Sequence, residues 1–230
     1  ELERVVVKLN EGFSGEGNAP LELGPLQLAD RSGDERRRRL RQALEQLPMP
    51  PPQWQQLLVE QGALVEAWLQ GGEALHSPSV QGMIHPGGQV EMLSTHEQIL
   101  GGPNGQTYQG CRFPADAAYR EALLRHGRAV GEALAQEGAL ERFAVDFIAR
   151  RFGEQWDLQA IEVNLRKGGT THPFMALRYA TNGRIDPISG VFHAPSGQKL
   201  CYVATDNLCD ARLRGLLPLD LIDIVAVAGL

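Results

Sequence analysis

Three polar side chains in the second half of the chain alternate with apolar ones. Glu162, Asn164 and Arg166 are spaced by two, and an apolar residue precedes each of them. Successive side chains of a β-strand point to opposite faces, so this spacing predicts a carboxylate, an amide and a guanidinium on one face. Such a row of groups could coordinate a hard cation through oxygen and stabilise negative charge beside it.

A second carboxylate is expected on the neighbouring strand. Asp146 interrupts the apolar run 143–148, and Gly153 and Glu154 separate this run from the polar row. A hairpin that turns at residue 154 places Asp146 directly opposite Glu162, so that two carboxylates and an amide converge. Mg²⁺ usually takes one or two carboxylates together with substrate phosphates. The alternative is a surface strand whose acidic residues are simply solvated.

The start of the chain could hold phosphate. Lys8 ends the β-branched run 5–9, and residues 12–17 form a glycine-rich loop. Backbone N–H groups of such a loop can bind phosphate oxygens while the lysine neutralises their charge, although an ordinary turn is the alternative. The loop is neither a Walker A sequence nor GxGxxG. It nearly matches the GxSxG elbow of serine hydrolases around Ser14, but Glu16 replaces the last glycine, which disfavours that chemistry.

Hydrophobic spacing and turn residues predict the elements that must position these groups. Gly138 is expected to end the longest helix. The predicted strands are 5–9, 63–69, 79–84, 89–94, 143–149 and 158–166; the predicted helices are 34–47, 53–61 and 115–136, followed by a C-terminal hairpin and helix. This order predicts an α+β protein whose sheet is largely antiparallel.

Composition excludes several classes of protein. The chain has 230 residues with 43% hydrophobic and 22% charged residues, as expected for a folded protein. A net charge of −6 argues against nucleic acid as the main partner, and the sequence contains no apolar run of 18 residues that would span a membrane. Three scattered cysteines without a CxxC pair favour a cytoplasmic setting. Because the chain starts abruptly and without Met, we expect it to be part of a longer protein.

Several segments together resemble the ATP-grasp superfamily, in the same order along the chain. Residues 5–8 with the loop 11–18 resemble the lysine strand and the mobile phosphate-covering loop of that family. Residues 64–73 are similar to its adenine hinge. Asp146 and the sequence Glu162-Val163-Asn164-Leu165-Arg166 resemble its acidic strand and its E-x-N-x-R metal motif.

The resemblance implies an ATP-grasp fold, in which two α+β subdomains, residues 1–70 and 71–230, clasp ATP between antiparallel sheets. By the same resemblance, we expect the N-terminal domain of the family to lie outside this chain. The resemblance also implies a role for individual residues. These are Lys8, Gly12, Ser14, Gly15 and Gly17 at the phosphates, Glu66 and Leu69 at the adenine edge, Glu73 at the ribose, Asp146, Glu162 and Asn164 as ligands of Mg²⁺ or Mn²⁺, and Arg166 with Lys8 in catalysis.

The activity implied by the resemblance is ATP-dependent ligation of a carboxylate to an amine. An acylphosphate would form with release of ADP, and the amine would then displace phosphate, so the expected partners are ATP, a carboxylate substrate and an amine substrate. Residues 8–19 and 164–173 look most like the pheganomycin-type peptide ligases. His172 either contacts substrate or has a structural role. The alternative function is a nucleotide-binding regulatory module without catalysis.

Overall fold

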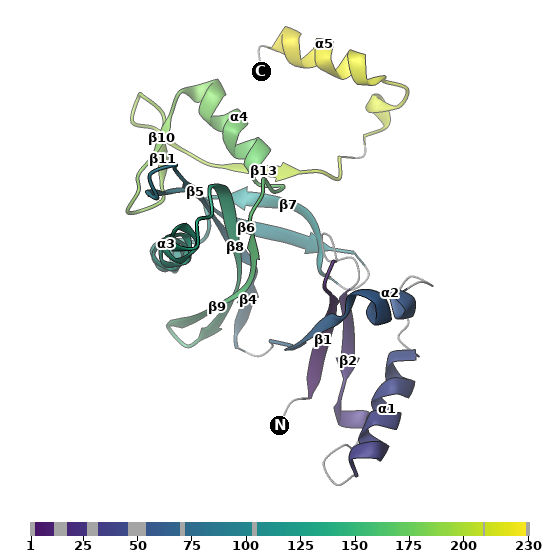
Figure 1. Ribbon diagram of the computed structural model, residues 1–230. Coiled ribbons are helices and arrows are strands. Elements are labelled where there is room, and N and C mark those ends of the chain that lie inside the picture. The colour runs from purple at the N-terminus through teal and green to yellow at the C-terminus, as the bar shows by residue number, and fades with distance from the viewer. Residues whose placement is uncertain are drawn as a thin grey trace. The chain divides into compact units, whose positions relative to one another are not determined.

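The computed structural model of the chain describes residues 3–11, 18–26, 32–45, 54–69, 72–102, 105–208 and 210–228. It confirms the α+β class (Figure 1). The chain divides into two compact units. The first comprises Glu1–Gln70 and Gly101–Tyr108, and the second comprises Gly71–Leu100 and Gln109–Leu230. The first unit therefore includes residues 101–108, which lie beyond the boundary expected from the sequence at residue 70.

The first unit is built on a three-stranded antiparallel sheet. Its strands lie in the order β2 (Asn18–Glu22), β1 (Arg4–Leu9) and β3 (Ala63–Ala67). Val7 and Leu9 of β1 are buried against Leu57 and Leu58 of α2 (Trp54–Gln61), because the β-branched run gives the strand an apolar surface. The remaining elements are the 3₁₀ turn η1 (Gly24–Leu26) and α1 (Gly33–Glu45). A hydrogen bond of 2.9 Å from the Asn18 amide to Gln106 attaches the segment 105–108 to β2.

The second unit contains the larger sheet. Its strands lie in the order β13, β7, β6, β5, β8, β4, and β9 pairs with β8. Their bounds are β4 Ala74–His76, β5 Pro78–Ile84, β6 Val90–Gly101, β7 Thr107–Phe113, β8 Glu141–Phe152, β9 Gln155–Asn164 and β13 Tyr202–Thr205. The other elements are α3 Arg120–Gln136, α4 Thr171–Thr181, β10 Arg184–Ile185, β11 Phe192–His193, β12 Lys199–Leu200, η2 Ala211–Leu213 and α5 Pro218–Ala228.

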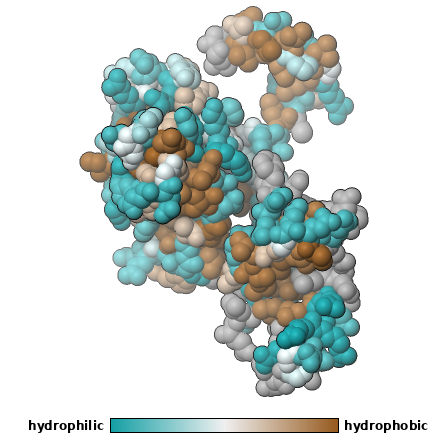
Figure 2. All heavy atoms as spheres, in the orientation of Figure 1, coloured by the Kyte–Doolittle hydropathy of each residue, from teal (hydrophilic) through white to brown (hydrophobic). Residues whose placement is uncertain are grey.

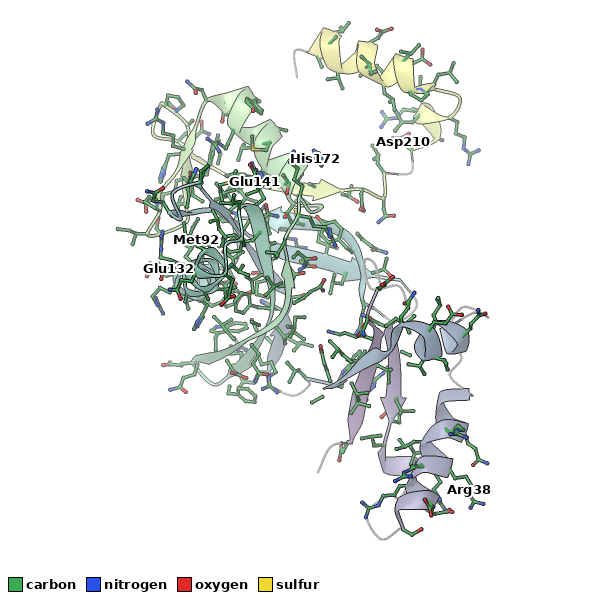
Figure 3. All side chains as sticks on the ribbon, in the orientation of Figure 1. Arg38, Met92, Glu132, Glu141, His172 and Asp210 are labelled. Carbon is green, nitrogen blue, oxygen red and sulfur yellow. The ribbon has the colours of Figure 1, made fainter. Side chains whose placement is uncertain are left out.

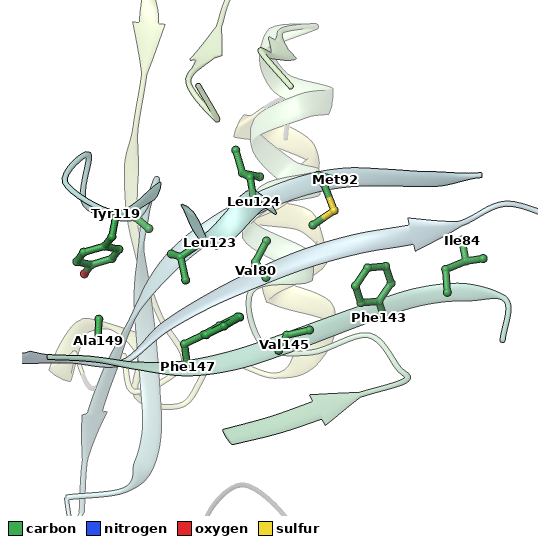
Figure 4. Packing of buried hydrophobic residues seen from close by; sticks show 11 residues of the cluster. Val80, Ile84, Met92, Tyr119, Leu123, Leu124, Phe143, Val145, Phe147 and Ala149 are labelled. Atoms are coloured by element: carbon green, nitrogen blue, oxygen red, sulfur yellow. The ribbon is translucent and has the colours of Figure 1, made fainter. Parts of the chain in front are cut away.

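The two faces of this sheet are covered by different helices. On one face, Val80, Val145 and Phe147 pack with Leu123 of α3 in the main core (Figure 4). On the other face, Leu93 packs with Phe174 of α4 in a second cluster that also contains Phe113 and Phe192. Because β-strand side chains alternate, the polar residues of β5 and β8 that lie between the core residues belong to the α4 face.

The start of the longest helix differs from the sequence expectation. Residue 115 was the expected start, but α3 begins at Arg120. The Asp116 carboxylate accepts the Ala118 N–H at 2.9 Å, and this local hydrogen bond holds a turn before the helix. Gly138 follows the helix with φ of +85°, a conformation that confirms the predicted stop.

The C-terminal helix α5 is the most apolar helix of the chain, and its side chains are exposed (Figure 2). Leu219 is 71% exposed and Val227 is 90% exposed. Among the residues that the structure describes, no helix combines the length and the apolar character needed to cross a membrane.

Candidate functional site

The two acidic strands pair as the sequence predicts. β8 and β9 form an antiparallel hairpin in which Asp146 lies opposite Glu162. A β-bulge adjoins this pair, because Phe147 pairs with Ala160 and Ile161 is left as the extra residue on β9. The Asn164 amide nitrogen lies 3.4 Å from the Asp146 carboxylate. The hairpin therefore brings the three expected metal ligands to one place on the α4 face.

The environment of Asp146 disfavours its negative charge. The pKa of Asp146 is raised to about 6, mainly by burial and also by the negative charge of Glu162. Hydrogen bonds donated by Ser79 and Gln98 and the positive charge of Arg166 act in the opposite direction. Burial and a second carboxylate thus leave excess negative potential that a cation would neutralise.

The donor chemistry of this cluster suits Mg²⁺. Asp146 and Glu162 offer carboxylate oxygens and Asn164 offers an amide oxygen, which are hard ligands. Glu162 is exposed and Asn164 is half-buried, so both are accessible. No group of three or more His, Cys, Asp or Glu residues suitable for a metal occurs in the described part of the chain. A site with two carboxylates is what Mg²⁺ uses when substrate phosphates complete its coordination.

Lys8 lies in the first unit and forms an ion pair. Its Nζ is 2.6 Å from the carboxylate of Glu66, a residue of the neighbouring strand β3. Leu69 follows the end of β3 and is half-buried. The expected phosphate-contacting residues of the glycine-rich loop, Gly12, Ser14, Gly15 and Gly17, lie outside the described residues.

The remaining expected residues belong to the second unit. The Glu73 carboxylate lies 3.2 Å from the Arg151 guanidinium of β8, and most of its side chain is exposed. Arg166 is exposed and follows the end of β9. His172 lies in the first turn of α4 and is also exposed (Figure 3).

Sequence reasoning missed the residues that support Asp146. Ser79 on β5 and Gln98 on β6 both donate hydrogen bonds to its carboxylate. A signal was present in β5, where Ser79 and Gln81 alternate with the apolar Val80, and such spacing indicates a strand with one polar face. In β6, residues 94–98 are all polar, so their spacing did not show which of them faces Asp146.

Comparison with protein families agrees with this geometry. The family model described as IQCH-like, ATP-grasp matches residues 51–187, which is more than half of the chain. The chain belongs to the IQCH-like ATP-grasp family. The matched region contains β8, β9 and the three expected metal ligands.

A curated relative is known for this ATP-grasp chain. The L-propargylglycine–L-glutamate ligase of Streptantibioticus cattleyicolor is 41% identical over 136 residues, which cover 59% of the chain and 26% of the relative. The chain therefore matches about a quarter of that ligase.

Solved structures confirm the ATP-grasp fold. The N5-carboxyaminoimidazole synthetase of Staphylococcus aureus, complexed with ADP, matches with a TM-score of 0.52 at 14% identity and covers 97% of this chain and 50% of its own. The biotin carboxylase domain of the Hydrogenobacter thermophilus 2-oxoglutarate carboxylase, in complex with MgADP, matches with a TM-score of 0.51 at 20% identity and covers 80% of this chain and 34% of its own.

Proposed function

We propose that this chain is the ATP-binding part of an ATP-dependent carboxylate–amine ligase that joins amino acids. The observation that carries the proposal is the acidic pair Asp146 and Glu162, with the Asn164 amide beside it. Family membership and the curated ligase relative support the same activity. The resemblance of residues 8–19 and 164–173 to pheganomycin-type peptide ligases favours amide formation between amino acids.

In this proposal the two units are the subdomains that clasp ATP, and each residue has a defined role. Glu66, Leu69 and Glu73 bind the adenosine, while Lys8 and the glycine-rich loop neutralise the phosphates. Asp146, Glu162 and Asn164 would hold Mg²⁺, which would supply positive charge to stabilise the negative phosphates. Arg166 stabilises negative charge on the transferred phosphoryl group or on the tetrahedral oxyanion. Phosphoryl transfer depends mainly on such positioning and charge neutralisation.

The products of the reaction test this proposal. The full-length protein, incubated with Mg-ATP, L-propargylglycine and L-glutamate, the substrates in the relative's name, should release ADP and phosphate together with an amide, whereas the present chain alone is expected to show at most nucleotide binding. Replacement of Arg166 by Met should lower kcat more than it weakens ATP binding, because the charge that Arg166 meets develops during the reaction. AMP and pyrophosphate as stoichiometric products would contradict the proposal. ATP binding without turnover would favour the regulatory module instead.

A further inference from the structure

Arg142 is half-buried, and among the described residues its guanidinium has no ion pair. It lies on β8, four residues before Asp146, and its register partner on β5 is Met83, so its side chain belongs to the α4 face. The buried Nη1 of Arg142 has no hydrogen-bond partner among the described residues. Its Nη2 donates to the thioether sulfur of Met175 on α4 at 3.2 Å. A thioether is a weak acceptor, whereas a guanidinium forms its strongest contacts with carboxylates.

Arg150, on the same strand, is an arginine whose guanidinium is paired with a carboxylate. It lies on the same face of β8, and both its Nε and its Nη2 donate to the Asp157 carboxylate, at 3.2 and 2.6 Å. The two arginines are similarly half-buried. Arg150 therefore has a carboxylate against its guanidinium, whereas Arg142 has the weak sulfur contact of Met175.

Arg142 and the acidic pair lie on the same face of the sheet. Arg142 and Asp146 are separated by about 13 Å of strand, at about 3.3 Å per residue. Ala144 lies midway between them, with Gln81 on one side and Asn164 on the other. Ala144 and Gln81 are buried, at 7% and 4% exposed, whereas Arg142 and Asn164 are half-buried.

Hydrogen bonds of Thr171 hold the start of α4 beside Gln81 of β5. The Thr171 hydroxyl donates to the Gln81 side chain at 3.4 Å and accepts the Gly168 N–H at 3.1 Å. The hydroxyl of Ser94, whose register partner is also Gln81, is buried and has no partner in the described part of the chain. The Ser94 hydroxyl thus lies on the same face as Arg142.

We propose that Arg142 binds an amino-acid substrate through the carboxylate that takes no part in the reaction. This carboxylate displaces the sulfur of Met175 from the guanidinium. The inference rests on the proposed ligase function and adds the residue that selects a substrate with a second charge. L-Glutamate, named in the relative's activity, has such a carboxylate, because one of its two remains free when the other reacts. Methionine is unbranched and flexible, so it can leave the guanidinium without rearrangement of the helix.

The first test compares stability and binding. Arg142→Met should raise the Tm of the ligand-free protein by about 2 to 4 °C, because a half-buried guanidinium with one buried, unpaired nitrogen is removed. Arg150→Met is the matched control and should lower the Tm, since it leaves Asp157 unpaired. L-Glutamate should raise the Tm of the unaltered protein, and Arg142→Met should abolish this shift. At least one of the two glutamate monoamides, L-glutamine or L-isoglutamine, should produce a smaller shift than L-glutamate in the unaltered protein.

A second variant places the ligand group inside the protein. Met175→Glu puts a carboxylate next to Arg142, so it should raise the Tm and raise the KM for L-glutamate about 10- to 100-fold, with the KM for ATP unchanged. Met175→Gln is the neutral control and should change both values much less. Equal effects of the two variants would overturn the proposal.

The outcomes separate this site from the ligase function. If Arg142→Met lowers the Tm as Arg150→Met does, and L-glutamate binding is unchanged, Arg142 is structural and the proposal is wrong. If the unaltered protein shows no shift with L-glutamate, the proposal is also wrong. If glutamate binding depends on Arg142 but no ADP is released with any substrate pair, the carboxylate site stands and the ligase function fails.

Discussion

The two faces of the large sheet differ in the kinds of side chain that they bury. The face under α3 buries apolar side chains, which need no hydrogen-bond or ionic partner. Val145 and Phe147 are almost fully buried there among other apolar groups. The α4 face has its own apolar cluster around Phe174, but it also contains the crowded carboxylate of Asp146 and an Arg142 nitrogen that has no hydrogen-bond partner among the described residues. One face is therefore mainly apolar, whereas the other combines apolar packing with polar groups that the proposed ligands would satisfy. Sites prepared for ligands commonly reduce stability in this way.

The largest effect should come from the core face. Phe147→Ala removes a side chain that is 2% exposed, and it should lower the free energy of unfolding by about 3 to 5 kcal/mol. Urea denaturation measures this change. A loss below about 1 kcal/mol would show that the α3 face does not provide the stability assigned to it.

Gly127 tests how tightly α3 packs on that face. A Cβ at this position would lie 2.6 Å from the Val80 side chain and 2.8 Å from Met92. Gly127→Ala should therefore destabilise the protein by about 1 to 3 kcal/mol, although alanine in a helix normally stabilises by about 1 kcal/mol. Glu132→Ala, on the same helix, is the control for the effect of introducing alanine. Gly138→Ala would not serve, because the positive φ of Gly138 disfavours any side chain. A stabilised Gly127→Ala protein would contradict the close packing.

Asp146→Asn should act in the opposite direction. Because the folded-state pKa of Asp146 is raised to about 6, ionisation of this residue costs stability as the pH rises from about 4 through about 6. In the presence of EDTA, the asparagine variant should be more stable than the unaltered protein above about pH 7, by about 1 to 3 kcal/mol. The difference should disappear near pH 4. Denaturation curves across this range measure it, and a constant difference would show that the charge of Asp146 is not its source.

The smallest effect on the metal-free protein is expected for Glu162→Gln. Glu162 is exposed, so its replacement should change the free energy of unfolding by less than about 0.5 kcal/mol in EDTA. The stabilisation by Mg-ATP should nevertheless fall sharply, because a ligand carboxylate is lost. Glu154→Gln, in the hairpin turn, is the matched control. An unchanged thermal response to Mg-ATP in Glu162→Gln would contradict the metal assignment.

The pairing of Asp146 with Glu162 shows how much of the candidate site could be predicted from the sequence. A turn centred on residue 154 predicts that Asp146 faces Glu162, and this pairing is confirmed. The structure achieves it differently, with the two-residue turn Gly153 and Glu154 and the extra residue Ile161. Periodicity predicted the faces of the strands, but a bulge has no clear sequence signal, because it depends on packing across the sheet.

Arg142 shows what could not be predicted. In the sequence it is one of several arginines. That its Nη1 has no partner among the described residues, and its Nη2 only a sulfur, appears only when β8 lies under α4. The elements were predictable because they depend on local spacing, whereas the state of a charge depends on neighbours distant in sequence. For the same reason, the hydrogen bonds from Ser79 and Gln98 to Asp146 required the assembled sheet.

Strand β9 lies at an edge of the sheet, because β8 is its partner on one side and no other described strand pairs with it. Val163 and Leu165 are exposed near its end, at 46% and 59%. An open edge with apolar side chains invites pairing with another chain, and a charge on the strand opposes such self-association. The charge of Glu162 should therefore also oppose aggregation through this edge. Any variant that neutralises it should be purified at low protein concentration and checked by light scattering before its activity is interpreted.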